Sequence, residues 1–247
     1  MKTVWIAAGA LMMTTLVQAE EAAAVKPWQT SAELGAITTS GNTSGTSVTG
    51  KIDARQETTH WSNEYVVSAF FKEDRKTDED GVSYTEKAAE KYLVSAKGGY
   101  KLDNDHAKLF VLGSHTRDEF GAYRDYSLVA AGYGDRMYQG KSVVIDAEIG
   151  PGYYVGKTSD DLKEKGAMLR TAASLDWTIS DSAMFRQTVS YEAGADNKRS
   201  IAESSLSTKI NGSMQMKAAF LIQHDSQVPL GKKSTDTQTS LTLVYSF

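Results

Sequence analysis

Charged side chains of both signs recur at every second position in several stretches of the sequence. Because alternate residues of a β-strand point to the same face, each run places its charges on one side of a strand. Around an aqueous interior, such charges would select ions or small polar solutes by sign and size, or they would pair and fill the interior. Ten residues are predicted to line this interior: Lys51, Asp53, Arg55, Glu57, Asp146, Glu148, Arg170, Asp176, Arg186 and Glu192.

Two histidines lie close to a serine and could belong to a hydrolytic site. His115 follows Ser114, and His224 precedes Ser226 by two positions. Phospholipases of the outer membrane use Ser, His and Asn on the outer surface of a barrel, and these pairs could mimic them. Neighbouring residues of a strand point to opposite faces, so His115 cannot reach Ser114 without a bulge. We predict no catalytic residue and no enzyme, with a hydrolase as an alternative.

One acidic run could chelate a divalent cation, since hard cations prefer several oxygen ligands. It comprises Glu73, Asp74, Asp78, Glu79 and Asp80. The run lacks the spacing of a calcium-binding loop, and the basic residues Arg75 and Lys76 lie within it. A solvated loop explains such a run equally well, so we predict no metal and no cofactor.

The elements that must position these side chains are strands of alternating polarity. Asn211-Gly212 between two alternating runs is a strong hairpin signal, because both residues tolerate the positive φ of a tight turn. Gly150-Pro151-Gly152 within a run predicts a bulge or kink. Twelve strands are predicted, at residues 28–39, 46–57, 62–73, 85–100, 107–117, 124–137, 141–155, 166–179, 183–194, 200–210, 213–225 and 236–247. The count is even, as in single-chain bacterial barrels.

The connections alternate between short turns and longer, charged segments, which are clearest at 73–85, 157–165 and 226–235. This alternation is typical of short periplasmic turns and longer extracellular loops, with both termini in the periplasm. Aromatic residues gather near strand ends and would form two girdles at the membrane surfaces. They are Trp28, Trp61, Tyr84, Tyr100, Phe120, Tyr123, Tyr138, Tyr153, Tyr154, Trp177 and Tyr245.

The N-terminal residues differ from the rest and predict export. Lys2 precedes a nearly apolar run from Val4 to Val17, and cleavage is expected after Ala19. Residues 1–19 are therefore expected to be a signal peptide, residues 20–27 a short periplasmic segment and residues 28–247 the barrel. The 247 residues include no Cys, which excludes a disulfide scaffold. A net charge of −4 does not suit nucleic-acid binding. A mean hydropathy of −0.38 fits a membrane barrel and a soluble periplasmic β-protein equally.

The C-terminal residues form a strand with one apolar face, made by Leu241, Leu243, Tyr245 and Phe247. A chain that ends on an aromatic residue after such a run resembles the C-terminal signature of bacterial outer-membrane barrels. This resemblance implies that these four residues are an assembly signal for the barrel-assembly machinery.

Several short motifs occur in the same order as in a known family. They are Ser40-Gly41-Asn42-Thr43, Glu90-Lys91-Tyr92, Ala131-Gly132-Tyr133-Gly134, Gly150-Pro151-Gly152 and the stretch from Trp177 to Phe185. Across nearly the whole mature chain the sequence resembles the YdiY-like family of salt-induced outer-membrane proteins, a β-barrel family of unknown function. The resemblance implies a link to salt or envelope stress and carries over no functional residue.

The expected fold is therefore all-β: a transmembrane antiparallel up-and-down barrel of about twelve strands in the outer membrane of a Gram-negative cell. The expected function is a narrow channel for ions or small polar solutes. A closed structural barrel of the envelope is the alternative. The expected partners are outer-membrane lipid, lipopolysaccharide and the barrel-assembly machinery, without nucleic acid.

Overall fold

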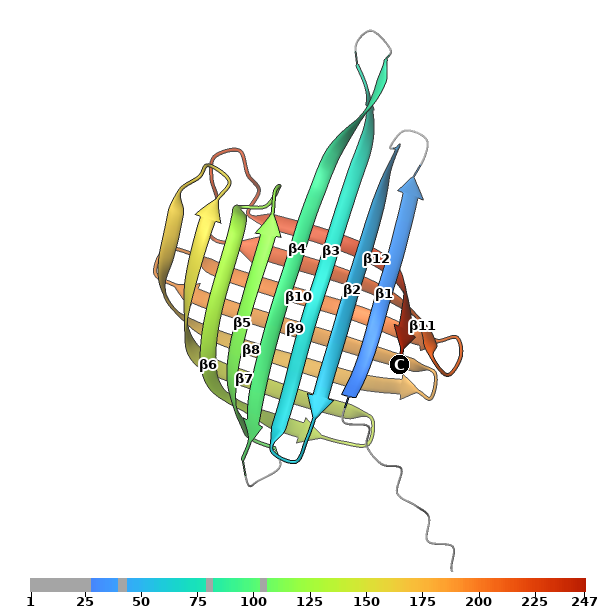
Figure 1. The fold of residues 1–247 in the computed structure, drawn as a ribbon, viewed down its shortest axis with the longest axis vertical. Helices are drawn as coiled ribbons and strands as arrows, with labels where there is room; N and C mark the ends of the chain where they lie inside the picture. The colour runs from blue at the N-terminus through green and yellow to red at the C-terminus, as the bar shows by residue number, and fades with distance from the viewer. Residues whose placement is uncertain (1–27, 40–43, 79–81, 103–105) are drawn as a thin grey trace, which may run out of the picture.

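The chain forms a closed barrel of twelve antiparallel strands in a computed structural model that describes residues 28–39, 44–78, 82–102 and 106–247 (Figure 1). The strands are β1 (Trp28–Thr39), β2 (Ser44–Glu57), β3 (Trp61–Thr77), β4 (Ser83–Lys101), β5 (Lys108–Asp118), β6 (Tyr123–Gln139), β7 (Val143–Thr158), β8 (Lys163–Ser180), β9 (Ala183–Gly194), β10 (Lys198–Lys209), β11 (Met214–Asp225) and β12 (Thr235–Ser246). Each strand pairs with its sequence neighbours, and β1 pairs with β12 to close the barrel. The predicted all-β class and strand number are confirmed. The predicted signal peptide, the 20–27 segment, Ser40–Thr43, Glu79 and Asp80 lie outside the described residues.

Alternation along the strands places large apolar side chains on the outer face of the barrel. On β12, Leu241, Leu243 and Tyr245 are 49%, 43% and 51% exposed, whereas Thr242 and Val244 between them are buried. The pattern is inverted relative to a water-soluble protein, because the large apolar side chains are on the outside. A barrel surrounded by an apolar medium accounts for this arrangement.

The barrel has two ends, which we call the terminal end, where both termini of the barrel lie, and the loop end, where the longer connections lie. The terminal end holds the start of β1, the end of β12 and the turns at 58–60, 140–142 and 181–182. The loop end holds the connections at 119–122, 159–162, 195–197 and 226–234. Because consecutive strands run antiparallel, every odd-numbered strand runs from the terminal end to the loop end.

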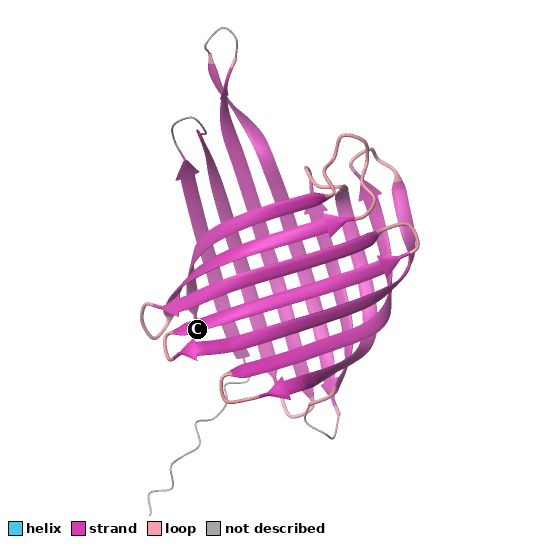
Figure 2. Cartoon of the chain, turned by 180° about the vertical axis from the view of Figure 1, so that it is seen from behind, coloured by secondary structure: helices cyan, strands magenta, loops and turns pink. Residues whose placement is uncertain are grey.

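The wall formed by β1–β5 crosses the wall behind it at a large angle, as Figures 1 and 2 show from opposite sides. The two walls meet through side chains. Lys91 of β4 donates a hydrogen bond of 2.9 Å to Gln223 of β11, although four strands lie between them on the shorter path around the barrel. The interior is therefore narrow at this level.

The β3–β4 hairpin is longer than predicted and projects beyond the rim of the barrel (Figure 1). The expectation of a loop over 73–85 was wrong for most of that segment, because the ladder continues to Thr77 paired with Ser83. An ion pair of 2.5 Å between Lys76 and Glu86 joins the two strands there. The predicted loop at 157–165 is likewise reduced to residues 159–162, while 226–234 remains a loop.

Gly150-Pro151-Gly152 contains no register shift, so of the predicted bulge or kink the bulge was wrong, and the β6–β7 ladder lacks pairs only at Gly150 and Pro151 of this motif. The glycines instead allow β6 and β7 to approach closely. A Cβ added to Gly132 would lie 2.2 Å from the carbonyl oxygen of Ile149, and one added to Gly150 would lie 2.1 Å from that of Ala131. No side chain fits at either position without moving the backbone.

Candidate functional site

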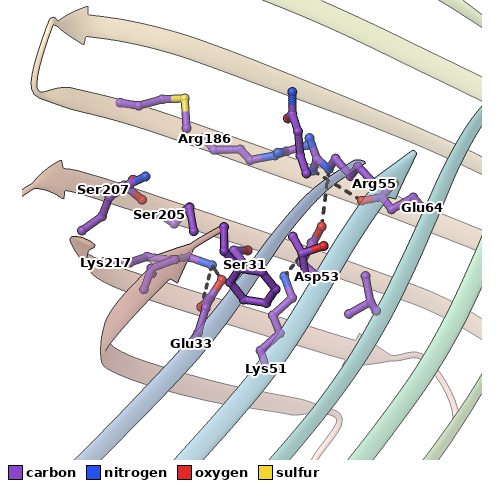
Figure 3. Close-up of a pocket in the computed structure, with 18 of the residues that line it drawn as sticks. Ser31, Glu33, Lys51, Asp53, Arg55, Glu64, Arg186, Ser205, Ser207 and Lys217 are labelled. Atoms are coloured by element: carbon purple, nitrogen blue, oxygen red, sulfur yellow. Dashed lines mark hydrogen bonds and ion pairs between the residues drawn. The ribbon is translucent and has the colours of Figure 1, made fainter. Parts of the chain in front are cut away.

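A polar cavity of about 620 Å³ occupies the terminal end of the barrel (Figure 3). Lys51, Asp53 and Arg55 of β2 project into it and form a chain of ion pairs. The Lys51 to Asp53 and Arg55 to Asp53 distances are 3.4 and 3.5 Å, and Arg55 also lies 3.4 Å from Glu64. Three predicted lining residues of one strand therefore share one wall of this cavity.

The opposite wall of the cavity carries its own charges. Arg186 of β9 pairs with Asp176 at 3.3 Å, and its guanidinium points toward that of Arg55 across the cavity in Figure 3. Lys217 of β11 lies 3.2 Å from Glu33 and 3.4 Å from Glu203. The lining therefore consists of paired charges of both signs together with serine hydroxyls, and it carries no large excess of either sign.

Glu148 is the centre of the charge network halfway along the barrel. Lys97 lies 2.8 Å from its carboxylate, Lys108 lies 3.4 Å away and Arg170 lies 3.8 Å away. Arg170 also approaches Glu192, at 3.9 Å. Three cationic groups around one largely buried carboxylate compensate for the cost of removing that carboxylate from water.

The two remaining predicted residues lie nearer the terminal end. Glu57 pairs with Lys101 at 2.7 Å, and Asp146 pairs with Arg136 at 3.0 Å. Both pairs are more exposed than the network around Glu148.

Sequence reasoning missed a buried arginine at the loop end. The side chain of Arg199 is 7% exposed, and its Nε lies 2.9 Å from Asp225. Its guanidinium carbon is 4.1 Å from the ring centre of Tyr126 and 5.2 Å from that of Tyr123. Such cation–π contacts are strongest when the cation is removed from water. The Tyr126 hydroxyl in turn donates a 2.8 Å hydrogen bond to Glu192.

Tyr123 and Tyr154 are only 2% exposed and lie inside the barrel, so the prediction that they belong to an aromatic girdle was wrong. They pack with Phe110, Leu112 and Met168, among others, in an apolar cluster that fills one side of the interior. Inward-facing glycines provide the space. A Cβ on Gly156 would lie 2.6 Å from the Tyr123 ring. Such glycines opposite tyrosines are the sequence signal that could have revealed the cluster.

The 226–234 loop folds over this cluster. Val228 packs against the cluster, and Lys232 donates a 2.9 Å hydrogen bond to the carbonyl oxygen of Phe120. Asn197 accepts hydrogen bonds from Ser226 and Gln227. These contacts tie the loop to two neighbouring loops and cover part of the loop end.

A second cavity, of about 420 Å³, lies at the loop end between β2–β4 and β11–β12. Lys91 forms part of its wall and holds Asp118 at 3.4 Å and Gln223 at 2.9 Å. A smaller cavity of about 240 Å³ lies deeper in the barrel, beside Glu64, Arg170 and Arg199. The interior is thus a series of chambers separated by side chains.

The histidines do not pair with the serines considered from the sequence. His115 Nδ1 lies 2.8 Å from Ser127 on the adjacent strand, and His224 Nδ1 lies 2.9 Å from Thr235. Among the described residues, neither histidine hydrogen-bonds to Ser114, Ser226, an Asn or a carboxylate, so neither pair forms the Ser, His and Asn arrangement considered above. The described part of the chain also contains no cluster of three His, Asp or Glu residues suited to a metal ion. Nor does any helix within it have the length and apolar character needed to cross a membrane.

Residues 32–247 match a family described as "Protein of unknown function, DUF481". The chain belongs to this family. A curated relative, the uncharacterized protein YdiY of Escherichia coli (strain K12), is 28% identical over 231 residues, which cover 93% of this chain and 87% of YdiY. The predicted resemblance to a YdiY-like family is confirmed, and the match extends over nearly the whole barrel of this DUF481 protein.

Solved barrels of other families resemble this DUF481 structure in fold alone. The translocator domain of the autotransporter NalP from Neisseria meningitidis has a TM-score of 0.50 at 13% identity, covering 90% of this chain and 88% of that domain. The NanC porin has a TM-score of 0.52 at 7% identity, covering 88% and 98%. An outer membrane channel from Pseudomonas putida F1 has a TM-score of 0.50 at 10% identity, covering 89% and 94%. The fold is that of outer-membrane barrels.

Proposed function

We propose that the protein is an outer-membrane channel that passes small ions and polar solutes through a narrow lumen lined with ion pairs. The outer face supports the membrane location. Apolar side chains from most strands are exposed there, and five of them, Leu34, Ile52, Val111, Val129 and Leu169, are between 47% and 67% exposed. An apolar surface that surrounds the whole molecule is stable in lipid and unfavourable in water.

One observation carries the channel function: cavities with charged side chains in their linings lie at both ends of the same barrel, and among the described residues only side chains separate them. The cavity of about 620 Å³ reaches the terminal rim at Trp28 and Phe247. The cavity of about 420 Å³ lies at the loop end. Side chains rotate on a time scale of picoseconds to nanoseconds when they are exposed, whereas a backbone plug would have to unfold. Hydrated ions could therefore pass when the Lys91 to Gln223 contact opens.

A closed structural barrel is the second candidate, and a specific observation favours it. Arg199 and Asp225 are both buried and joined by two hydrogen bonds, and the apolar cluster around Tyr126 fills the interior beside them. If the Lys91 to Gln223 contact remains closed as well, no continuous path crosses the barrel. The protein would then be a structural component of the envelope and would transport nothing.

Conductance across a planar bilayer distinguishes the two candidates. Refolded protein lacking residues 1–19 is inserted into the bilayer, and insertion is verified by protease protection and heat-modifiable mobility in gels. Discrete current steps would support the channel, and the reversal potential in a salt gradient would give its charge preference. Silent protein that has inserted and folded would overturn the channel and favour the closed barrel.

The cellular side of the proposal comprises export by the signal peptide, assembly through Leu241, Leu243, Tyr245 and Phe247, and contact with lipopolysaccharide. The family resemblance also supports a link to salt or envelope stress. Fractionation of a Gram-negative host tests the location, because an integral barrel requires detergent for extraction, whereas a soluble periplasmic protein is released by osmotic shock. Quantifying the protein in cells grown at low and high salt tests the stress link.

A further inference from the structure

The seam between the first and last strands is paired over only part of its length. Ser31–Leu34 of β1 pair with Leu243–Ser246 of β12, and Thr30 exchanges two hydrogen bonds with Phe247. Beyond Leu34, within the described residues, no ladder pair joins β1 to β12. Both strands continue toward the loop end, where β1 pairs only with β2 and β12 only with β11. The wall of the barrel therefore has an unpaired segment at this seam.

A narrow cleft lies at this unpaired segment and leads inward. Gly35 and Thr49 line one side of the cleft, and Ser240 and Leu241 line the other. Ser47, Phe70 and Thr239 line both the cleft and the cavity of about 420 Å³ at the loop end. Thr239 belongs to the outward-facing set of β12 residues and still lines the cavity. The cleft is therefore lined by residues from both faces of the barrel wall, and it is closed at Gly35, where an added Cβ would lie 2.5 Å from the Leu241 carbonyl oxygen.

The cleft holds only about 10 Å³, so a ligand can pass only if β1 and β12 move apart. Opening the unpaired segment breaks no ladder hydrogen bond between these strands, unlike opening any other seam of the barrel. Unpaired backbone groups are costly in hydrocarbon, which places this segment near the polar head groups or against a polar ligand. The segment runs from the middle of β12 to the loop end, so its outer part meets the first condition and its inner part, at the cleft, requires the second.

The cavity behind the cleft is amphipathic. Phe70, Phe120 and Leu221 supply an apolar lining, and charged side chains lie beside them. Two of these charges are neutralised within the protein: Lys72 pairs with Asp74, and Lys91 pairs with Asp118. The side chain of Asp236 on β12 also lines the cavity and forms no hydrogen bond or ion pair with the described residues, and Lys91 and Lys232 interact with it only at longer range. One carboxylate is therefore available beside an apolar surface.

We infer that the β1–β12 seam is a lateral portal through which an amphiphile with an apolar chain and a cationic head enters the loop-end cavity from the surrounding membrane. The chain packs on Phe70 and Phe120, and the head pairs with Asp236. The inference rests on the proposed membrane location. It does not require an axial channel, because the ligand enters and leaves through the wall.

Fluorescence quenching in lipid vesicles tests the portal. The barrel without residues 1–19 contains Trp28, Trp61 and Trp177, and all three are replaced by Phe. A single tryptophan is then introduced as Phe70→Trp, inside the cavity, or as Leu206→Trp, on the outer face. The probes are ω-bromoundecyltrimethylammonium and the anionic ω-bromoundecanoate, since bromine quenches tryptophan on contact.

The cationic probe should quench most of the fluorescence in both proteins, and quenching of Phe70→Trp should saturate. The anionic probe should quench Phe70→Trp much less, and Asp236→Asn should remove this difference between the probes. An unquenched Phe70→Trp protein beside a quenched Leu206→Trp protein would overturn the portal. If Leu206→Trp itself stays unquenched, the proposed membrane location is wrong and the inference fails with it.

Cross-linking distinguishes lateral entry from entry through the loop end. The chain has no natural Cys, so Ala36→Cys with Leu241→Cys can be joined by a short bis-maleimide across the unpaired segment. Leu34→Cys with Leu243→Cys is the matched control, because these residues are partners in the paired segment. The link between positions 36 and 241 should abolish rapid quenching of Phe70→Trp, and the link between positions 34 and 243 should leave the quenching rate unchanged. Equal quenching rates in both linked proteins would overturn the lateral route.

Discussion

Lys91 of β4 reaches across the barrel and donates a 2.9 Å hydrogen bond to Gln223 of β11. In the proposed channel this contact is the constriction. Lys91→Ala should therefore raise single-channel conductance by roughly twofold, because ion flow is limited by the narrowest part of a pore. Lys87→Ala is the matched control. It removes the same charge from the same strand, but Lys87 pairs with Glu90 outside the constriction. An unchanged step size in Lys91→Ala would show that the constriction lies elsewhere.

Glu148 is the carboxylate shared by Lys97, Lys108 and Arg170 halfway along the barrel. Glu148→Gln removes this shared negative charge and leaves Glu64 and Glu192 as the acidic partners of Lys97 and Arg170. The reversal potential in a salt gradient should move toward anion selectivity, since charged rings select ions by sign. Glu148→Asp keeps the charge and should keep the wild-type reversal potential. A shift of the same size in both variants would contradict the role of charge.

Arg199 and Asp225 should behave as a buried pair. Arg199→Met alone leaves the Asp225 carboxylate without its main partner and should lower the free energy of unfolding by about 3–5 kcal/mol. Adding Asp225→Leu removes the unpaired charge and should restore much of that loss. Urea unfolding of the refolded barrel in detergent measures both values. Additive losses in the double variant would show that the pair is not a unit.

Because β6 and β7 approach closely, replacing either of two glycines by alanine should lower the stability of the barrel. Gly132→Ala and Gly150→Ala each place a Cβ near 2 Å from a backbone oxygen, so each should cost about 1–3 kcal/mol of stability through forced backbone movement. Gly113→Ala is the control, because a Cβ there meets no atom within 4 Å. Its stability should stay the same or rise by about 0.5 kcal/mol. Equal effects at all three positions would contradict the steric account.

Deletion of Phe247 separates assembly in the cell from stability. Phe247 exchanges backbone hydrogen bonds with Thr30 at the edge of the seam, and its side chain is 64% exposed. If its main role is recognition by the assembly machinery, the deletion should strongly reduce folded protein in the membrane fraction. The same protein refolded from urea should lose only about 2 kcal/mol, the value of two typical hydrogen bonds. A recognition role would be rejected if the loss of folded protein in cells were no larger than the loss of stability in vitro accounts for.

Periodicity predicted the strands well, because a residue's face follows from its position alone. The outward set of β12 and the inward run of Lys51, Asp53 and Arg55 both follow from the two-residue repeat. The same repeat extends through the β3–β4 hairpin, where a charged sequence was mistaken for a loop. Its charges pair between the two strands, as Lys76 and Glu86 do. A ladder in water can carry charge on both faces, so polarity alone does not mark its end.

The contents of the interior could not be predicted, because alternation does not say which strands face each other. Contact between Lys91 and Gln223 depends on how the two walls cross, which a one-dimensional pattern does not contain. The inward position of Tyr154 depends on the glycines that oppose it, Gly166 and Gly194, on the neighbouring strands β8 and β9. These relationships involve three or more strands at once.

The short paired segment at the β1–β12 seam also has a kinetic consequence. Ala32 and Tyr245, which pair there, stand at opposite ends of the described chain. Every other ladder joins strands adjacent in sequence, so hairpins can form early, at low cost in loop-closure entropy. Closure of the circle requires the longest loop and gains few hydrogen bonds in return. We therefore expect a late folding intermediate in which eleven ladders are complete and the sheet is still open.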